Sequence, residues 1–191
     1  CSAFPVLGTV PAELTQVENL YGVESDGSKA EKQNLLPLGF SITYKKNRPF
    51  PHTLHLVPKT VVLGIGCKRG TEAESIRALI RETLEQNQIF KESICLIASI
   101  DLKKDEEGIR ICAEELGVPF VTWSAEELEQ VRSEDGFTES AFVRSVAGVG
   151  NVCERSALKG AGTSRLLIRK TAHNGVTVAA AVKDYTVCME D

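Results

Sequence analysis

One run, residues 60–71, constrains the fold more than any other part of the chain. An apolar, β-prone segment leads directly into the glycines Gly64, Gly66 and Gly70 and then into an amphipathic pattern. Because glycine permits positive φ and close backbone approach, this run predicts a buried strand, a turn and a helix. Thr71 and Glu74 have the spacing of a capping box and predict where that helix begins.

The glycine turn is also a candidate anion site. The first N–H groups of a helix have no partner within the helix, and they favour negative charge. Lys68 and Arg69 add two cations at the same place. The glycine spacing is G-x-G-x-x-x-G rather than the dinucleotide fingerprint G-x-G-x-x-G, so we do not expect a nucleotide cofactor. The alternative is that the glycines only let a strand turn into a helix that packs on its sheet.

Composition and charge narrow the class of partner. The 191 residues are 42% hydrophobic, enough for one good core. The 22 basic and 26 acidic residues are mixed along the chain and give a net charge of -4, so we expect no nucleic-acid partner. The chain has no apolar run of membrane-spanning length and no signal-peptide layout, which predicts a cytoplasmic protein without membrane contact. It begins at Cys1 rather than Met, and we expect it to be part of a longer protein.

The six cysteines are scattered along the chain and form no C-x-x-C pair. None has a histidine at the spacing of a metal site. Cys95 and Cys112 lie in a predicted strand and a predicted helix, where a free thiol packs as a small hydrophobic group. We therefore expect reduced, mostly buried cysteines and no metal site.

The pattern of elements changes at Pro58. Residues 1–58 are less regular, with strands predicted at 38–44 and 52–57, and we interpret them as a partial central segment or linker. Strands and helices alternate over residues 59–191, which is typical of an α/β domain. The predicted fold class is α/β, with three layers (α/β/α) and a largely parallel, mixed sheet, preceded by the partial strand-containing segment.

Charged residues follow the second predicted strand of this domain. Asp101 lies at the carboxyl end of the strand, and Lys104 and Asp105 come next. Because open α/β sheets bind ligands at the carboxyl ends of their strands, Asp101 is a candidate site residue. The alternative is that Asp101 or Asp105 caps the next helix, which is the commoner role.

A second glycine loop, residues 148–154, leads into a short helix predicted over residues 155–159. Two such loops in one small domain are more than packing usually requires. If both lie at the same edge of the sheet, their backbone donors and cations form a cleft for an acidic ligand.

Three further elements flank the second loop. Ser124 and Glu127 have capping-box spacing and predict a short helix. An Asn-Gly turn predicts a hairpin of residues 166–169 and 176–182. A helix predicted over residues 140–146 turns its apolar side chains inward, namely Phe142, Val143 and Val146.

In both glycine loops and the segments around them, the chain resembles the C-terminal part of the cobalt-precorrin-5A hydrolases, the lactone-opening enzymes of the anaerobic cobalamin pathway. The resemblance covers nearly all of residues 56–191. The preceding residues resemble the tail of the family's central region, and the family's N-terminal domain is missing. The matching segments occur in the family's order, and they are residues 56–58, 64–71, 98–106, 148–154 and 175–179.

The resemblance implies hydrolysis of the δ-lactone of cobalt-precorrin-5A, with release of acetaldehyde, to give cobalt-precorrin-5B. The cobalt arrives within the substrate, so no cofactor is expected. The implied partners are this small-molecule substrate, the missing N-terminal domain and other cobalamin-pathway enzymes. A stand-alone relative of the same domain in the aerobic pathway implies an alternative, a non-catalytic precorrin-binding or carrier domain.

Lactone opening needs a base that activates water and a group that stabilises the oxyanion. We expect Asp101 or Glu154 to act as the base, and Lys104 with loop N–H groups to hold the oxyanion. Cys67 and Cys153 are alternative nucleophiles, although packing is the commoner role for such cysteines. The expected substrate-binding residues lie in the two loops and the adjoining strand, and they are Gly64, Gly66, Cys67, Lys68, Arg69, Gly70, Ser99, Gly148, Gly150 and Asn151.

Overall fold

The computed structural model describes residues 4–7, 20–23 and 38–186. The chain forms two units, one of residues 1–58 with 185–191 and one of residues 59–184. The first unit contains a parallel sheet with the strand order β2-β1-β3-β4. Its strands are β1 (Phe4–Leu7), β2 (Leu20–Val23), β3 (Leu38–Ile42) and β4 (His52–Leu56).

The second unit is built on a five-stranded sheet with the order β7-β6-β5-β9-β8. Three of its strands are parallel, namely β5 (Val61–Cys67), β6 (Ile94–Ile100) and β7 (Phe120–Trp123). The other two are β8 (Leu166–His173) and β9 (Val176–Val182), a hairpin whose strand β9 also pairs antiparallel with β5. The hairpin therefore lies beside the central strand.

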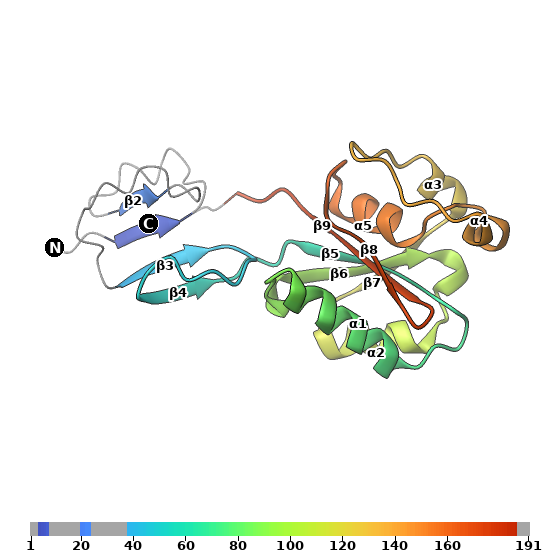
Figure 1. The fold of residues 1–191 in the computed structure, drawn as a ribbon, viewed down its shortest axis with the longest axis horizontal. Coiled ribbons are helices and arrows are strands. Elements are labelled where there is room, and N and C mark those ends of the chain that lie inside the picture. Colours follow the sequence, from blue (N-terminus) through green and yellow to red (C-terminus); the bar gives the residue numbers. More distant parts are fainter. Residues whose placement is uncertain (1–3, 8–19, 24–37, 187–191) are drawn as a thin grey trace. The chain divides into compact units, whose positions relative to one another are not determined.

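Helices cover both faces of this sheet (Figure 1). One face carries α1 (Ala73–Gln86) and α2 (Glu107–Leu116). The other carries α3 (Ala125–Glu129), α4 (Ala141–Ala147) and α5 (Cys153–Ala161). Two short 3-10 helices, η2 (Lys91–Ser93) and η3 (Asp101–Lys103), precede and follow β6. The predicted fold class, α/β with a mixed sheet, is confirmed.

The core lies along β5 and β9. Val61, Val62, Leu63 and Ile65 of β5 are fully buried, as are the small side chains in the middle of β9. A strand covered by helices on both faces reads as a continuous apolar run rather than an alternating one, which is why the run at residues 61–65 predicted this strand. Within the described residues, no helix has the length and apolarity needed to cross a membrane.

Gly64 allows α5 to lie directly on β5. A Cβ added at Gly64 would overlap the carbonyl oxygen of Cys153 and lie 2.7 Å from the backbone nitrogen of Ala157. Both are backbone atoms of α5, so relief requires the helix to move away from the sheet. The glycine therefore serves helix packing at this position.

We expect Gly64→Ala to lower the free energy of unfolding by about 3 kcal/mol, because the overlap is with fixed backbone. Urea denaturation measures this loss. Gly66→Ala is the matched control. A Cβ added at Gly66 would have one contact closer than 3 Å, namely the Thr177 hydroxyl oxygen at 2.7 Å. That side chain can rotate, so we expect a loss below about 1 kcal/mol. Equal losses at the two positions would contradict this account of the packing.

The helix after the first glycine turn does not begin with the predicted capping box. Its N-cap is Glu72, whose side chain makes no capping hydrogen bond. The Thr71 hydroxyl instead donates to the carbonyl oxygen of Lys68 at 2.7 Å, and Glu74 pairs with Arg77. The prediction was wrong because Thr71 stabilises the turn rather than the helix.

The predicted caps of the next two helices, α2 and α3, have different outcomes. Glu106 is the N-cap of α2, so neither Asp101 nor Asp105 caps it, contrary to that alternative. The capping box of Ser124 and Glu127 at the start of α3 is present, as predicted.

The side chains of α4 do not all face inward as predicted. Phe142 is 73% exposed and Val146 is 63% exposed. The neighbouring side of this short helix packs on the core, through Val143 and Ala147. The apolar pattern of α4 is therefore divided between the core and an open surface.

Candidate functional site

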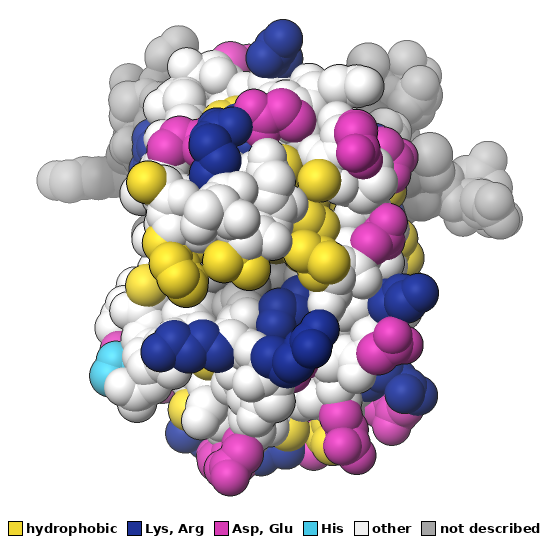
Figure 2. All heavy atoms as spheres, turned by 90° about the vertical axis from the view of Figure 1, so that its right-hand side faces the viewer, with side chains coloured by type: hydrophobic (Ala, Val, Ile, Leu, Met, Phe, Trp, Pro, Cys, Tyr) yellow, Lys and Arg dark blue, Asp and Glu magenta, His cyan; other side chains and the backbone are white. Residues whose placement is uncertain are grey.

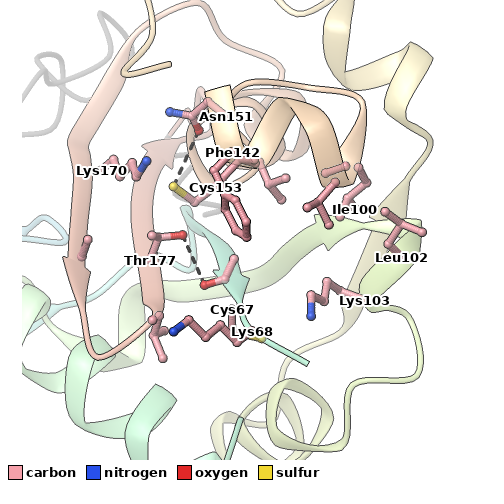
Figure 3. A pocket seen from close by; sticks show the side chains of 18 of the residues that line it. Cys67, Lys68, Ile100, Leu102, Lys103, Phe142, Asn151, Cys153, Lys170 and Thr177 are labelled. Atoms are coloured by element: carbon pink, nitrogen blue, oxygen red, sulfur yellow. Dashed lines mark hydrogen bonds between the residues drawn. The ribbon is translucent and has the colours of Figure 1, made fainter. Parts of the chain in front are cut away.

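A pocket of about 630 Å³ lies at the carboxyl ends of β5 and β6, beside the β8–β9 hairpin (Figure 3). Its remaining walls come from η3, α4 and the first residues of α5. Open α/β sheets place their ligands at this edge. The volume falls within the range of about 300–1,000 Å³ that is usual for small-molecule pockets.

Both glycine loops reach this pocket. Residues 66–69 of the first loop line it, and so do residues 151–153 of the second. The two loops therefore meet at one edge of the sheet, which is the arrangement that the sequence-based hypothesis requires. Five predicted binding residues lie on the pocket surface, namely Gly66, Cys67, Lys68, Arg69 and Asn151.

One side of the pocket is basic. We call Lys68, Arg69, Lys103 and Lys170 the cationic wall. The tip of the hairpin positions Lys68. The backbone N–H of Lys68 donates to the carbonyl oxygen of Gly175 at 3.2 Å, and the aliphatic part of the Lys68 side chain lies over that glycine. No Asp, Glu or His is among the described residues that line the pocket. The pocket thus attracts anions although the whole chain carries a net charge of -4.

The opposite side is apolar. We call Phe142, Val146 and Leu102, with Ile100 at their base, the apolar wall. Phe142, Val146 and Leu102 are 73%, 63% and 58% exposed, and exposed apolar groups of this size commonly mark binding surfaces. Figure 2 shows apolar side chains on one side of a hollow and Lys and Arg side chains on the other.

Two thiols lie between these walls. Burial raises the pKa of Cys153 to about 11, and its Sγ donates to the Asn151 side-chain oxygen at 3.7 Å. Burial also raises the pKa of Cys67, although Lys103 opposes this effect. Since the thiolate is the nucleophilic form, the raised pKa values disfavour the alternative in which either cysteine attacks the substrate at neutral pH.

Glu154, a predicted base, lies behind the pocket and not on its surface. The side chain is fully buried. Its oxygens accept hydrogen bonds from the backbone N–H of Thr138 at 2.9 Å, the Asn151 amide at 2.7 Å and the backbone N–H of Lys170 at 2.8 Å. Glu154 thus joins α5, the segment before α4 and β8. Its role as a base stays a prediction, and these contacts favour a structural role.

Asp101 and Lys104 are exposed and lie outside the pocket lining. Asp101 accepts a hydrogen bond from the Thr122 hydroxyl at 2.7 Å. Its neighbours Leu102 and Lys103 do line the pocket, because the turn of η3 directs them toward it. Asp101 therefore stands at the margin of the site.

The remaining predicted binding residues also lie outside the lining. Ser99 is buried and donates to the carbonyl oxygen of Ile65 at 2.7 Å. Gly148 is the C-cap of α4 with φ +78, and the carbonyl oxygen of Gly150 accepts from the Ser140 N–H. Gly70 donates its N–H to Glu106. These residues shape the loops, and their contact with a ligand stays a prediction.

The sequence-based search missed Lys103, Lys170, Phe142 and Thr177. Lys170 lies on β8, and no local pattern marks it as a site residue. The position of that strand beside the first glycine loop depends on sheet order, which has no local signal. Within the described part of the chain, no group of three or more His, Cys, Asp and Glu side chains is placed to hold a metal ion.

Residues 61–181 match the family model described as "Cobalamin synthesis G C-terminus". The chain belongs to this family. Every residue that lines the pocket lies within the matched stretch of this cobalamin synthesis G domain. The family assignment therefore covers the whole candidate site.

Curated relatives carry the name cobalt-precorrin-5A hydrolase. The Salmonella typhimurium protein is 38% identical over 134 residues, which are 70% of this chain and 37% of that protein. The Priestia megaterium protein is 34% identical over 128 residues, which are 67% of this chain and 33% of that protein. The cobalamin synthesis G domain described here thus spans about a third of the length of these relatives.

Solved structures show the same fold. CobE, a protein from the cobalamin (vitamin B12) biosynthetic pathway, aligns with a TM-score of 0.60 and 32% identity, over 65% of this chain and 91% of CobE. Cobalamin biosynthesis protein chiG from Agrobacterium tumefaciens aligns with a TM-score of 0.51 and 29% identity, over 65% of this chain and 99% of that one. The matched region thus makes up most of both solved chains.

Proposed function

We propose that this chain acts in cobalamin biosynthesis as the C-terminal domain of a cobalt-precorrin-5A hydrolase, and that its pocket holds the cobalt-precorrin. The observation that carries the proposal is the opposition of a cationic wall and an apolar wall across one pocket. The names of the relatives supply the substrate class.

The two walls fit the two parts of such a ligand. A tetrapyrrole-derived macrocycle has broad apolar faces, which pack against aromatic and aliphatic side chains such as Phe142 and Val146. It also carries several carboxylate arms, which form charge-assisted hydrogen bonds with ammonium and guanidinium groups such as Lys68 and Arg69. The cobalt enters as part of this substrate, so the domain itself needs no metal ligands.

Opening of the lactone adds water to the ester carbonyl carbon and breaks its bond to the ring oxygen, which leaves a carboxylate and an alcohol on the same molecule. Acetaldehyde then leaves when the alcohol loses its proton and its carbon–carbon bond to the macrocycle breaks, and the macrocycle carbon takes up a proton. A base must take a proton from the water, and donors must stabilise the oxyanion. Asp101, at the margin of the pocket, is the proposed base among the chain's own residues, and Lys104 follows in the same turn. Leu102, the neighbour of Asp101, lines the pocket, so Asp101 is one residue away from the lining. We propose that the pocket orients the substrate for this step.

A second candidate function is that of a non-catalytic precorrin carrier. The observation that favours it is the absence of Asp, Glu and His from the described lining residues, which leaves binding groups in the pocket without a base. Similarity to CobE, of which the chain covers 91%, fits a domain that works alone.

The test mixes the purified chain with cobalt-precorrin-5A and follows both the absorption spectrum and acetaldehyde. A spectral change with acetaldehyde release supports the hydrolase. Binding without release supports the carrier, and retention of full turnover by Asp101→Asn removes Asp101 as the base. The absence of any spectral change on titration would overturn both functions.

We expect Phe142→Ala to weaken binding of the tetrapyrrole about tenfold, because the ring loses its contact with the macrocycle face. Since Phe142 is 73% exposed, the free energy of unfolding should change by less than about 0.5 kcal/mol. Titration of uroporphyrin, followed by its absorption, measures the affinity. Leu54→Ala is the control, since Leu54 is 61% exposed and does not line the pocket. Equal affinities of the two variants would contradict the role of the apolar wall.

A further inference from the structure

The anion site that the first glycine loop offers is occupied by a carboxylate of the protein itself. The backbone N–H group of Gly70 donates to Glu106, which stands at the start of α2. Glu106 is 8% exposed. The N–H group of Gly70, which the sequence assigned to the ligand, is therefore already paired.

The same carboxylate holds one member of the cationic wall. The ammonium group of Lys103 lies 2.9 Å from Glu106 Oε2, and the side chains of the two residues are only 16% and 8% exposed. The other members, Lys68, Arg69 and Lys170, form no ion pair with any residue that the structure describes. The four cations of the pocket are thus of two kinds, three without a counter-charge and one with it.

Glu106 is fixed in this position. An added Cβ at Gly108, two residues further on, would overlap the carbonyl oxygen of Thr71, so the start of α2 lies tightly against the glycine loop. Burial raises the pKa of Glu106, but the hydrogen bonds from Lys103 and the loop N–H groups outweigh this effect and hold the pKa below its ordinary value. The carboxylate stays charged at neutral pH, and its hydrogen bonds to Gly70 and Lys103 hold it beside the pocket cation.

We propose that Glu106 is an internal counter-ion, which withholds Lys103 from the acidic ligand and so limits the affinity of the pocket. This inference rests on the proposed function. A ligand carboxylate near Lys103 must compete with a carboxylate that the loop holds in place. The ligand is then bound mainly by Lys68, Arg69 and Lys170. Weaker binding shows mostly as faster dissociation, which suits a domain that passes its ligand on.

The test compares Glu106→Gln with the double variant Lys103→Gln, Glu106→Gln. Glutamine keeps the shape of Glu106 and one oxygen for the loop N–H groups, but it frees the charge of Lys103. The double variant removes both charges, so the net charge of the pocket equals that of the unsubstituted chain. Uroporphyrin, a porphyrin with carboxylate arms, is the probe.

We expect Glu106→Gln to bind uroporphyrin about fivefold more tightly at low ionic strength, and this gain should shrink as salt is added. The double variant should bind within about twofold of the unsubstituted chain. Binding by Glu106→Gln that is no tighter than that of the unsubstituted chain overturns the counter-ion role and leaves the proposed function standing. No binding by the unsubstituted chain overturns the proposed function and this role with it.

A second measurement needs no ligand and no folded Glu106 variant. Lysine acylation by acetic anhydride, followed by mass spectrometry of peptides, reports how free each ammonium group is. In the unsubstituted chain, Lys103 should react several-fold more slowly than Lys68, and the difference should narrow at high salt, because added ions weaken an ion pair. Equal reaction rates of the two lysines overturn the counter-ion role.

Discussion

Replacement of Lys68, Arg69 and Lys170 together by glutamine is expected to remove most of the affinity for the precorrin. Each charge-assisted hydrogen bond to a carboxylate contributes about 1.5 kcal/mol or more, so the triple variant should lose about a thousandfold in affinity. These three cations have no counter-charge among the described residues and face one pocket. Titration of the ligand into the variant, followed by absorption, measures the loss.

The control for this variant is a second triple substitution that changes the net charge equally. Lys59, Arg81 and Arg110 are exposed and lie outside the pocket, so glutamine at these positions should leave the affinity within about twofold. If both triple variants lose affinity equally, the ligand responds to the overall charge of the chain and not to the cationic wall. If neither loses affinity, the ligand binds elsewhere.

Short-range features of the fold could be read from the sequence. The apolar run before Gly64 predicted β5, and the Asn-Gly turn predicted the β8–β9 hairpin, because each signal lies within a few neighbouring residues. The shared edge of the two glycine loops was a conditional hypothesis, which named Lys68, Arg69 and Asn151. It had no local signal, because the second loop joins α4 to α5 and does not follow a strand.

Other site residues depended on contacts between distant parts of the chain. Lys170 reaches the pocket only because β9 pairs with β5 and carries β8 beside it. The choice between Lys103 and Lys104 depends on one turn of η3, which places the first in the pocket and the second outside. Neither the sheet order nor the direction of such a turn has a local sequence signal.

The apolar residues of α4 show a different difficulty. A helix with an apolar stripe is normally read as packing on the core. Phe142 and Val146 extend that stripe onto a surface that faces the pocket instead. A ligand-binding surface and a core surface have the same composition, so the pattern alone does not distinguish them.

Glu154, the last residue of the second glycine loop, was one of two candidate bases, but its partners come from elsewhere in the sequence. Thr138 and Lys170 each lie 16 residues away, and both donate backbone N–H groups to its carboxylate. A carboxylate that accepts from several buried donors cannot be removed without leaving those donors unpaired. This argument leads to a stability prediction rather than a catalytic one.

We expect Glu154→Gln to lower the free energy of unfolding by about 3 kcal/mol. Glutamine has nearly the same shape, but its amide NH₂ group must face either the N–H of Lys170 or the donors of Thr138 and Asn151, so at least one buried donor loses its acceptor. Urea denaturation of the chain measures this difference. Because Glu154 also holds Asn151 and β8 in place, binding of uroporphyrin should weaken in the same variant.

Glu134→Gln is the matched control, with the same chemical change in a solvated ion pair. Glu134 and Arg165 form that pair at 3.2 Å, with side chains 57% and 78% exposed. Glu134→Gln should therefore lower the free energy of unfolding by less than about 0.5 kcal/mol. A small loss at both positions would mean that water or a shift of the backbone satisfies the donors around Glu154. In that case the carboxylate would be free for another role, and its assignment as the base would regain support over the structural one.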